Sequence, residues 1–268
     1  MSVREIGVHS LGEFVDVVTP REPDPQTGRR RDTGVYRGAA HAAHPLLTSL
    51  DRLGGMNPPH TKVELEDHVL RSFIRYSRPH LDGARPHNEW EMLIAAQHHG
   101  VPTRLLDWTY SPLVAAFFAT RPSTGEDRDR AVWRLDWQRI HRHFNLPPLA
   151  LQVQDLDRMF GTGQTQTLSP ARLFSGAEHK NFACMIEPPS LDDRIVSQAA
   201  TFTFCSTACK SFDQFLEEQG LADTLTKYVI PARDVPRIRD QLDLVGIDER
   251  RLFPDLDGVA SAIQRYYA

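Results

Sequence analysis

Hydrophobic residues recur at helical spacing in the middle of the chain. Trp90, Leu93, Ile94 and Gln97 fall at i, i+3, i+4 and i+7, which is the spacing of the buried face of an amphipathic helix. Gly100 follows as a residue that readily adopts the left-handed conformation at a helix end, and the proline two positions later prevents the helix from resuming. We therefore expect a helix that ends at Gly100 and has one polar residue, Gln97, on its buried face.

A short strand and a second helix are predicted directly after this turn. Residues 103–108 have room only for a strand, and Ser111 and Pro112 are typical of the N-cap and the first position of a helix. The helix itself, residues 113–119, is apolar on every side. It is therefore expected in the core.

Similar patterns predict the other elements. S-x-x-E, T-x-x-E and S-x-x-Q spacings indicate helix starts, and alternating apolar residues indicate strands. Two loops are predicted, one at 20–34, which is rich in Gly and Pro, and one at 161–169, which is low in apolar residues. The predicted helices are 10–18, 61–76, one from 211, 234–245 and 253–267, and the predicted strands are 35–38, 131–135, 183–186, 194–204 and 228–230. These elements favour one α+β domain over residues 1–268, with a small mixed or antiparallel sheet flanked by helices. Its core spans about 35–260, and helix 10–18 packs on it.

Composition narrows the function classes. The chain has 268 residues, 40% hydrophobic and 25% charged, as an ordinary globular protein does, and no apolar run approaches the roughly 20 residues that span a bilayer. The first ten residues lack the apolar stretch of a secretory signal, so we expect a cytoplasmic protein without a membrane partner. The net charge of −4 argues against broad wrapping of nucleic acid but leaves a local basic groove open. Three cysteines without ligand spacing predict neither a disulfide framework nor a metal site.

Several polar residues are hard to explain by packing. Asp107, Thr109 and Ser111 lie where a strand enters the N-terminus of a buried helix, a place that favours anions. Arg37 ends an earlier strand beside Gly38, so its guanidinium is expected to face a cleft. The alternatives are that Asp107 only caps the helix or pairs with a neighbouring arginine, and that Arg37 is a surface residue.

Three further candidates come from helix faces and strand rows. Glu91 and His98 share one face of the helix before Gly100, within reach of each other, although His98 is also explained as a residue facing the helix dipole. Gln198 is predicted to lead the core-facing row of strand 194–204, where a polar side chain needs a hydrogen-bond partner. Arg104 is expected to be structural, paired with Asp107 or with a helix C-terminus.

Four segments together resemble the FRG domain, a family named for a (Phe/Tyr)-Arg-Gly motif. They are Tyr36-Arg37-Gly38, QHHGVPTRLLDWTYSPLVAAFFA at 97–119, RIVSQAATF from residue 194, and GIDERRLFPDLDG at 246–258. The resemblance extends over nearly the whole chain. It implies a fold more directly than a reaction.

A weaker resemblance implies chemistry. The order of an arginine on an early strand, a Ser or Thr before a helix and a polar residue on a later strand is similar to the Arg-Ser-Glu pattern of ADP-ribosyltransferases. That resemblance implies an ADP-ribosyltransferase-like fold and NAD as substrate. Arg37 would hold its phosphates or ribose, Thr109 or Ser111 would steady the nicotinamide ribose, and Gln198 would stand where the family has glutamate. Because glutamine cannot supply charge, Glu91 or Asp107 would have to provide the carboxylate.

Three functions therefore remain open. The first is an NAD-dependent ADP-ribosyltransferase that modifies a nucleic acid or a protein, as a toxin or an anti-phage defence effector. The second is a module that binds a nucleotide or nucleic acid in the same cleft without catalysis. The third and least favoured is a nuclease or other hydrolase in which His98 works with Glu91 or Asp107 as acid and base. The sequence leaves the acceptor and the oligomeric state undetermined.

Overall fold

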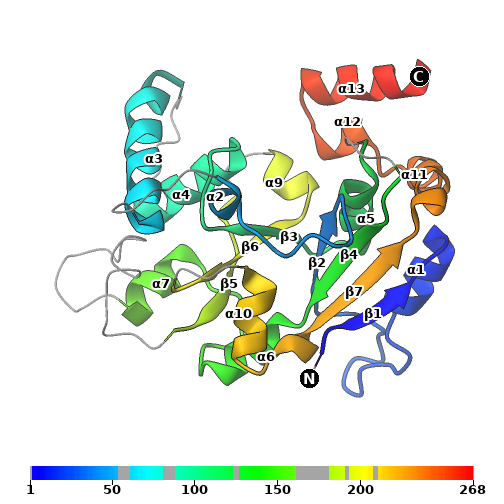
Figure 1. The fold of residues 1–268 in the computed structure, drawn as a ribbon, viewed down its shortest axis with the longest axis horizontal. Helices are drawn as coiled ribbons and strands as arrows, with labels where there is room; N and C mark the ends of the chain where they lie inside the picture. Colours follow the sequence, from blue (N-terminus) through cyan, green and yellow to red (C-terminus); the bar gives the residue numbers. More distant parts are fainter. Residues whose placement is uncertain are drawn as a thin grey trace.

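A seven-stranded mixed sheet runs through the centre of the protein (Figure 1). The structure is a computed structural model that describes residues 2–53, 61–80, 88–122, 127–160, 181–190, 193–207 and 211–267. The strand order is β1-β7-β4-β2-β3-β6-β5, and every pair is antiparallel except β1 with β7. The strands are β1 (Arg4–Gly7), β2 (Val35–Ala39), β3 (Leu106–Thr109), β4 (Arg130–Leu135), β5 (Ala183–Ile186), β6 (Ala200–Cys205) and β7 (Leu225–Ile230).

Helices flank this sheet, and several begin at the residues expected from the sequence. Ser10, Ser111 and Ser211 each accept a backbone N–H at the start of a helix, and Gly100 ends another with φ +79°. The described helices are α1 (Leu11–Val18), α2 (Ser49–Arg52), α3 (Lys62–Ser77), α4 (Glu89–His98), α5 (Pro112–Thr120), α6 (Trp137–His143), α7 (Val153–Phe160), α9 (Asp193–Ser197), α10 (Phe212–Glu218), α11 (Val235–Leu244), α12 (Glu249–Leu252) and α13 (Leu256–Tyr267), with short 3₁₀ turns η1 (Arg78–His80), η2 (Ala222–Thr224) and η3 (Ala232–Asp234).

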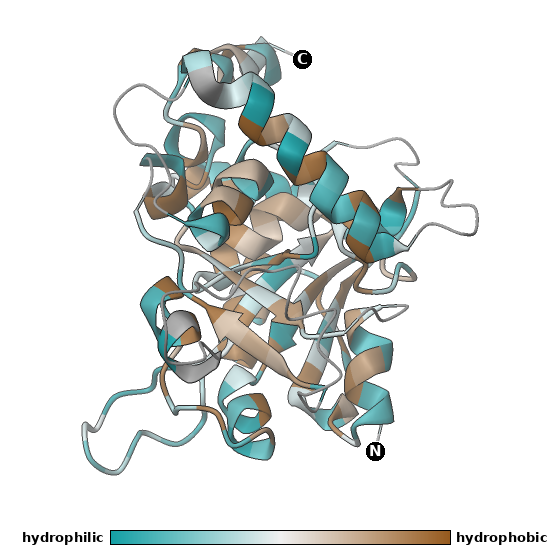
Figure 2. Ribbon diagram, turned by 90° about the vertical axis from the view of Figure 1, so that its left-hand side faces the viewer, coloured by the Kyte–Doolittle hydropathy of each residue, from teal (hydrophilic) through white to brown (hydrophobic). Residues whose placement is uncertain are grey.

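Hydrophobic cores fill both faces of the sheet. On one face α1, α5 and α11 cover the β2, β4 and β7 half, while α4 and α7 cover the β6 and β5 half. On the other face α6 and α10 pack beneath Trp108 and Trp133. Figure 2 shows hydrophobic residues gathered in the centre of the molecule and hydrophilic residues on the outer helices. The first face therefore carries two helical groups, with α9 lying between α4 and α5 in Figure 1.

The prediction for residues 194–204 was wrong in its first half. Residues 193–197 form α9, and β6 starts only at Ala200. Between them Ala199 has φ +46°, and the Thr109 hydroxyl and the Tyr110 N–H donate to the carbonyls of Gln198 and Ala199 at 2.7 and 3.1 Å. Because β3 holds this turn, Gln198 lies in a turn before the strand and does not lead its row.

Other differences are smaller. The sequence pattern missed β1, the short α2 and α12, and the helices α6 and α7, and it placed the last helix start at Phe253 where α13 begins at Leu256. The predicted loop at 161–169 lies outside the described residues. The expectation of helices flanking a mixed sheet is confirmed, although the sheet is larger than expected. None of the described helices is long and apolar enough to cross a bilayer.

Candidate functional site

A pocket of about 780 Å³ opens among β2, β3, α4, α5 and α9. It is called here the arginine pocket, because Arg37, Arg52, Arg121 and Arg194 all line it. Asp107 is the one acidic residue among the described residues of its wall. The volume falls in the range of small-molecule sites. The excess of positive charge on a chain of net charge −4 makes it suited to an anionic ligand.

Arg37 and Asp107 meet where β2 and β3 stop pairing. The two strands are registered only at Tyr36 and Thr109, and beyond this point Arg37 Nη1 donates to the Asp107 carbonyl at 2.7 Å and lies 3.4 Å from its Oδ2. The Arg37 side chain is 18% exposed, whereas that of Asp107 is 54% exposed. Both bonds use Nη1, so the edge formed by Nε and Nη2 is not used by them. That edge has the fork geometry that binds phosphate.

Gln97, the polar residue on the buried face of α4, fixes the other side of Asp107. Its Nε2 donates to Asp107 Oδ1 at 2.8 Å, and its Oε1 accepts from the Thr103 hydroxyl at 2.6 Å. That hydroxyl in turn accepts the Leu105 N–H at 3.1 Å, so its own proton is directed to Gln97. The amide orientation is thereby set, because the opposite one would bring two acceptors together at Asp107. Gln97 therefore positions the carboxylate of Asp107.

Burial lowers the pKa of Arg37 below its ordinary value, and the positive charge of Arg52 lowers it further, while Asp107 opposes both effects. A guanidinium keeps its proton under such shifts because its ordinary pKa lies above 12. The effect of burial is therefore to leave a poorly solvated cation in the pocket. Binding of an anion would relieve this unfavourable charge.

Gly38 serves packing. A Cβ at this position would lie 2.2 Å from the carbonyl oxygen of Ala115 and 2.4 Å from the backbone N of Ala119, both in α5. Only glycine allows β2 to approach the buried helix so closely. Gly38 lines the pocket. Its missing side chain is already explained by α5, and the predicted role in ligand binding is untested.

The predicted residues do not all reach one place. Arg37, Gly38, His98, Asp107, Thr109 and Gln198 line the arginine pocket, whereas Glu91 and Ser111 do not. Glu91 lines a separate pocket of about 450 Å³ with Tyr110 and Glu187. Ser111 accepts the Val114 N–H at 3.3 Å and so caps α5. Of the two carboxylates proposed to replace the missing glutamate, Asp107 is therefore the one in the pocket.

Thr109 and Gln198 are held mainly by protein contacts. The Thr109 hydroxyl donates to the Gln198 carbonyl at 2.7 Å and accepts the Ser111 N–H at 3.0 Å. Gln198 Nε2 donates to the Leu252 carbonyl at 2.9 Å. The side-chain oxygen of Gln198 remains the atom of this amide that can accept a hydrogen bond from a ligand hydroxyl.

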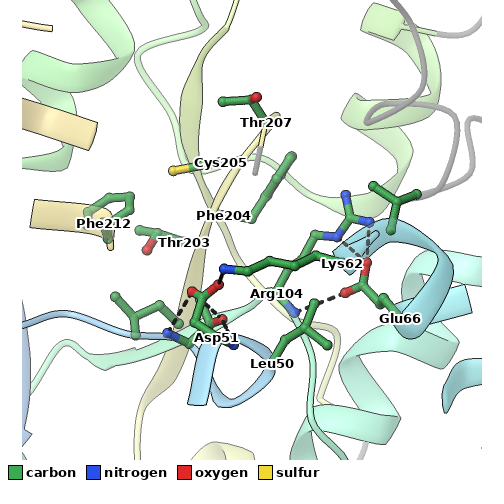
Figure 3. A pocket seen from close by; sticks show the side chains of 13 residues that line it. Leu50, Asp51, Lys62, Glu66, Arg104, Thr203, Phe204, Cys205, Thr207 and Phe212 are labelled. Carbon is green, nitrogen blue, oxygen red and sulfur yellow. Dashed lines mark hydrogen bonds and ion pairs between the residues drawn. The ribbon is translucent and has the colours of Figure 1, made fainter. Parts of the chain in front are cut away.

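Arg104 is buried and pairs with Glu66 of α3, a partner that was not predicted from the sequence. The guanidinium and the carboxylate form a buried ion pair, and Arg104 N–H also donates to Glu66 Oε1 at 2.9 Å. Figure 3 shows this pair beside a second ion pair, between Lys62 and Asp51. The sequence contains no local sign of this contact, because 38 residues separate the two partners.

Three arginines of the pocket were not predicted. Arg52 ends α2, Arg121 follows α5, and Arg194 lies in α9. The RIVSQAATF segment contained Arg194, but the expectation of a strand drew attention to Gln198. The available signal was their position in the sequence, because each of these arginines lies at or next to a helix end.

Comparison with known proteins finds one family match. The model of the FRG domain matches residues 32–130. The prediction of an FRG domain is confirmed for this range. Neither the curated proteins nor the solved structures contain a match to this chain.

The FRG match contains two of the four segments that suggested it, Tyr36-Arg37-Gly38 and residues 97–119. The other two, from residue 194 and at 246–258, lie outside the matched range, although Arg194 and Gln198 line the same pocket as Arg37. The extent of the domain over 1–268 stays a prediction. So does the likeness to ADP-ribosyltransferases.

Proposed function

We propose that this FRG protein binds a nucleotide through its phosphate groups in the arginine pocket, and that NAD is the first ligand to test. The observation that carries the proposal is the set of four arginines that line a pocket of about 780 Å³ together with a single aspartate. Guanidinium groups bind phosphate through parallel N–H bonds. A pocket with low-dielectric walls strengthens that attraction.

Arg37 is the residue assigned to phosphate binding. Its Nη1 is held by the carbonyl of Asp107 at 2.7 Å, which fixes the plane of the guanidinium before a ligand arrives. Because the side chain is already ordered and poorly exposed, less conformational entropy is lost on binding. The Nε and Nη2 edge then offers a preformed phosphate site.

ADP-ribosyl transfer is the reaction that Asp107 favours. In that reaction the bond between ribose C1′ and the nicotinamide nitrogen breaks, and its electron pair leaves with nicotinamide. An acceptor nucleophile then bonds to C1′ and loses a proton. In this proposal Asp107, whose carboxylate contacts Gln97 and Arg37, stabilises positive charge on the ribose.

Binding without catalysis is the second candidate. Gln198 stands where the transferase pattern has glutamate, and its Nε2 is engaged with the Leu252 carbonyl. An amide in this position orients a ribose hydroxyl but supplies no negative charge. The two candidates share the ligand and differ in whether nicotinamide is released.

A thermal shift with NAD tests the binding. A ligand at 100 times its Kd stabilises the folded state by about 2.7 kcal/mol, and Arg37→Ala should abolish this shift, because a lost charge-assisted hydrogen bond costs about 1.5–3 kcal/mol. Arg237→Ala removes a positive charge from the exposed face of α11 and should leave the shift unchanged. If neither NAD nor ADP-ribose stabilises the wild type, the nucleotide proposal is wrong.

Release of nicotinamide separates the two candidates. With a protein or nucleic-acid acceptor present, a transferase releases nicotinamide, and Asp107→Asn should slow release more than it weakens NAD binding, as expected for an interaction that is stronger in the transition state. Gln198→Glu should keep or increase release. A wild type that binds NAD and releases no nicotinamide with any acceptor is a binding module. Expression that arrests growth of a bacterial host only with Asp107 intact would support a role as a toxin or defence effector.

A further inference from the structure

Helix α13 carries a row of exposed apolar side chains. It lies above α12 at the edge of the molecule, away from the sheet (Figure 1). Large apolar side chains lie at four of its positions, spaced 3, 4 and 3 residues apart and 86%, 43%, 55% and 82% exposed: Leu256, Val259, Ile263 and Tyr266. Tyr267, 83% exposed, extends this row, and the five residues are called here the α13 stripe. A contiguous apolar surface of this kind marks an interaction site.

Another face of α13 attaches the helix to the rest of the protein. A Cβ at Gly258 would lie 1.9 Å from the Phe253 carbonyl oxygen, so only glycine allows the helix to approach this backbone so closely. Towards the other end, the Arg265 guanidinium donates to the Asp243 carboxylate of α11 at 2.8 and 3.0 Å and to that of Asp240 at 3.3 Å. Gly258 and Arg265 are seven residues apart and therefore share one face of the helix, while the α13 stripe lies on another. The stripe is thus exposed on a helix whose position is fixed.

The spacing of the α13 stripe fits a second copy of the same helix. Positions 3, 4 and 3 residues apart are the a, d, a and d positions of a coiled-coil seam. In an antiparallel pair whose two-fold axis lies level with Ser261, Leu256 faces Tyr266 of the second copy and Val259 faces Ile263 of the second copy, because both pairs of positions are centred on 261. Each contact then occurs twice, as an interface between identical surfaces requires.

The charges of α13 favour this partner over others. Asp255 and Asp257 lie at the start of the helix, so a parallel pair would bring two acidic ends together, whereas an antiparallel pair keeps them apart. The positions beside the stripe are small and uncharged, at Ala260 and Ala262. Arg265 is the basic residue of the helix, and α11 already binds it. The helix therefore offers no cationic face to an anionic membrane or to a nucleic acid.

The exposed area is on the scale of a reversible interface. A buried aromatic side chain contributes about 150–250 Å², so two tyrosines that are more than four-fifths exposed supply roughly 300 Å² per copy. The end of α11 adjoins the stripe, because Leu244, 85% exposed, follows the Asp243 that binds Arg265. A standard interface buries about 800 Å² per partner. The stripe and the end of α11 together therefore supply a large part of this area.

We propose that two copies of this chain associate through their α13 stripes as a reversible homodimer, with the two helices antiparallel about a two-fold axis level with Ser261. None of the stripe residues lines the arginine pocket, so the inference does not depend on nucleotide binding. It assigns a role to a helix that lies outside the matched FRG range.

Sedimentation equilibrium of the 268-residue chain over a range of concentrations tests the inference. The wild type should change from monomer to dimer as the concentration rises. Ile263→Glu should raise the dissociation constant of the dimer about a hundredfold or more, because its charge enters the symmetric interface twice. Ser261→Glu places the same charge at an exposed position of α13 outside the stripe and should leave the dissociation constant within about threefold. Circular dichroism checks that both variants are folded.

Cross-linking tests the orientation of the two helices. In the antiparallel pair Val259 faces Ile263 of the second copy, so a mixture of Val259→Cys and Ile263→Cys proteins should form a disulfide between the two variants faster than either variant links to itself. The wild type under the same conditions is the control for the native cysteines.

Four results would overturn the proposal. The first is a wild type that stays monomeric at its highest soluble concentration, and the second is a dimer whose dissociation constant is unchanged in Ile263→Glu. The third is faster linking of each cysteine variant to itself, which would show a parallel pair. The fourth is flotation of a monomeric wild type, but not of Ile263→Glu, with vesicles that contain phosphatidylserine, which would assign the α13 stripe to a lipid surface.

Discussion

At the scale of single residues, His141 shows how burial decides protonation. The ring is fully buried on α6, its Nδ1 lies 2.8 Å from the Pro147 carbonyl, and its Nε2 lies 2.9 Å from the Met185 backbone N. A carbonyl only accepts and an N–H only donates, so the proton belongs on Nδ1 and the imidazole is neutral. This histidine joins α6 to β5. Protonation of Nε2 would set two donors against each other.

His141 therefore predicts acid sensitivity. Burial lowers the pKa of His141 below its ordinary value of 6.5, so below about pH 6.5 the unfolded chain binds a proton that the folded chain does not. The free energy of unfolding should fall as the pH decreases through this window, by at most about 1.4 kcal/mol per pH unit from this group. Urea unfolding at pH 7.0, 6.0 and 5.0 measures it.

The slope with pH is the informative quantity, since His141→Gln also loses packing. The wild type should lose more stability between pH 7 and 5 than His141→Gln does over the same range. His143→Gln, at an exposed position of the same helix, should keep the wild-type slope. Equal slopes in the wild type and in His141→Gln would show that this group does not contribute.

At the scale of elements, a buried ion pair attaches helix α3 to the segment that leads into β3. Its fully buried charged residue is Glu66, which pairs with Arg104 just before β3. Removing one member of a buried ion pair leaves the other as an uncompensated charge. We expect Arg104→Met to destabilise the protein by about 3–5 kcal/mol in urea unfolding.

The same helix offers a matched control. Arg71 and Asp67 form an exposed i,i+4 ion pair at 3.0 Å, and Arg71→Met should cost less than about 1 kcal/mol. The double variant Glu66→Leu with Arg104→Met should be more stable than Arg104→Met alone, because no unpaired charge remains. If Arg104→Met is as stable as Arg71→Met, the Glu66–Arg104 ion pair does not stabilise the attachment of α3.

At the scale of the whole molecule, the FRG match covers only part of the seven-stranded sheet. Within residues 32–130, β2 and β3 share one registered pair, Tyr36 with Thr109, and their longer pairings are with β4 and β6. Nearly all of β4 and all of β6 lie beyond the matched range. A fragment of residues 32–130 would thus expose strand edges and the apolar side of α5.

We therefore expect the 32–130 fragment to lack a cooperative thermal transition, while the 268-residue chain unfolds in one. Circular dichroism melting of the two proteins, with NAD added in a second series, compares them. A cooperative transition in the fragment would show that the FRG match is an independent domain. Binding of NAD by a folded fragment would in addition exclude Arg194 and Gln198 from an essential role.

The sequence by itself determined the elements whose causes are local. Ser111 caps α5 and Gly100 ends α4 as expected, because a cap or a left-handed residue acts within about four positions of the chain. Arg37 was also expected to face a cleft because it ends a strand, and it lines the pocket together with Asp107. Their chemical roles stay predictions.

Only the tertiary structure decided which distant residues meet. Arg104 pairs with a residue of α3, Gly38 is required by the close approach of α5, and the end of β3 holds the turn that contains Gln198. Each of these features depends on contact with another element. Residues 198–204 alternate as a strand does, but hydrogen bonds from Thr109 and Tyr110 hold the turn at Ala199. The intrinsic preference of a segment for a strand contributes little free energy compared with such tertiary contacts. A single sequence does not reveal which elements pack together. For the same reason the sequence did not predict that Arg52, Arg121 and Arg194 line one pocket. Their meeting depends on how α2, α5 and α9 pack.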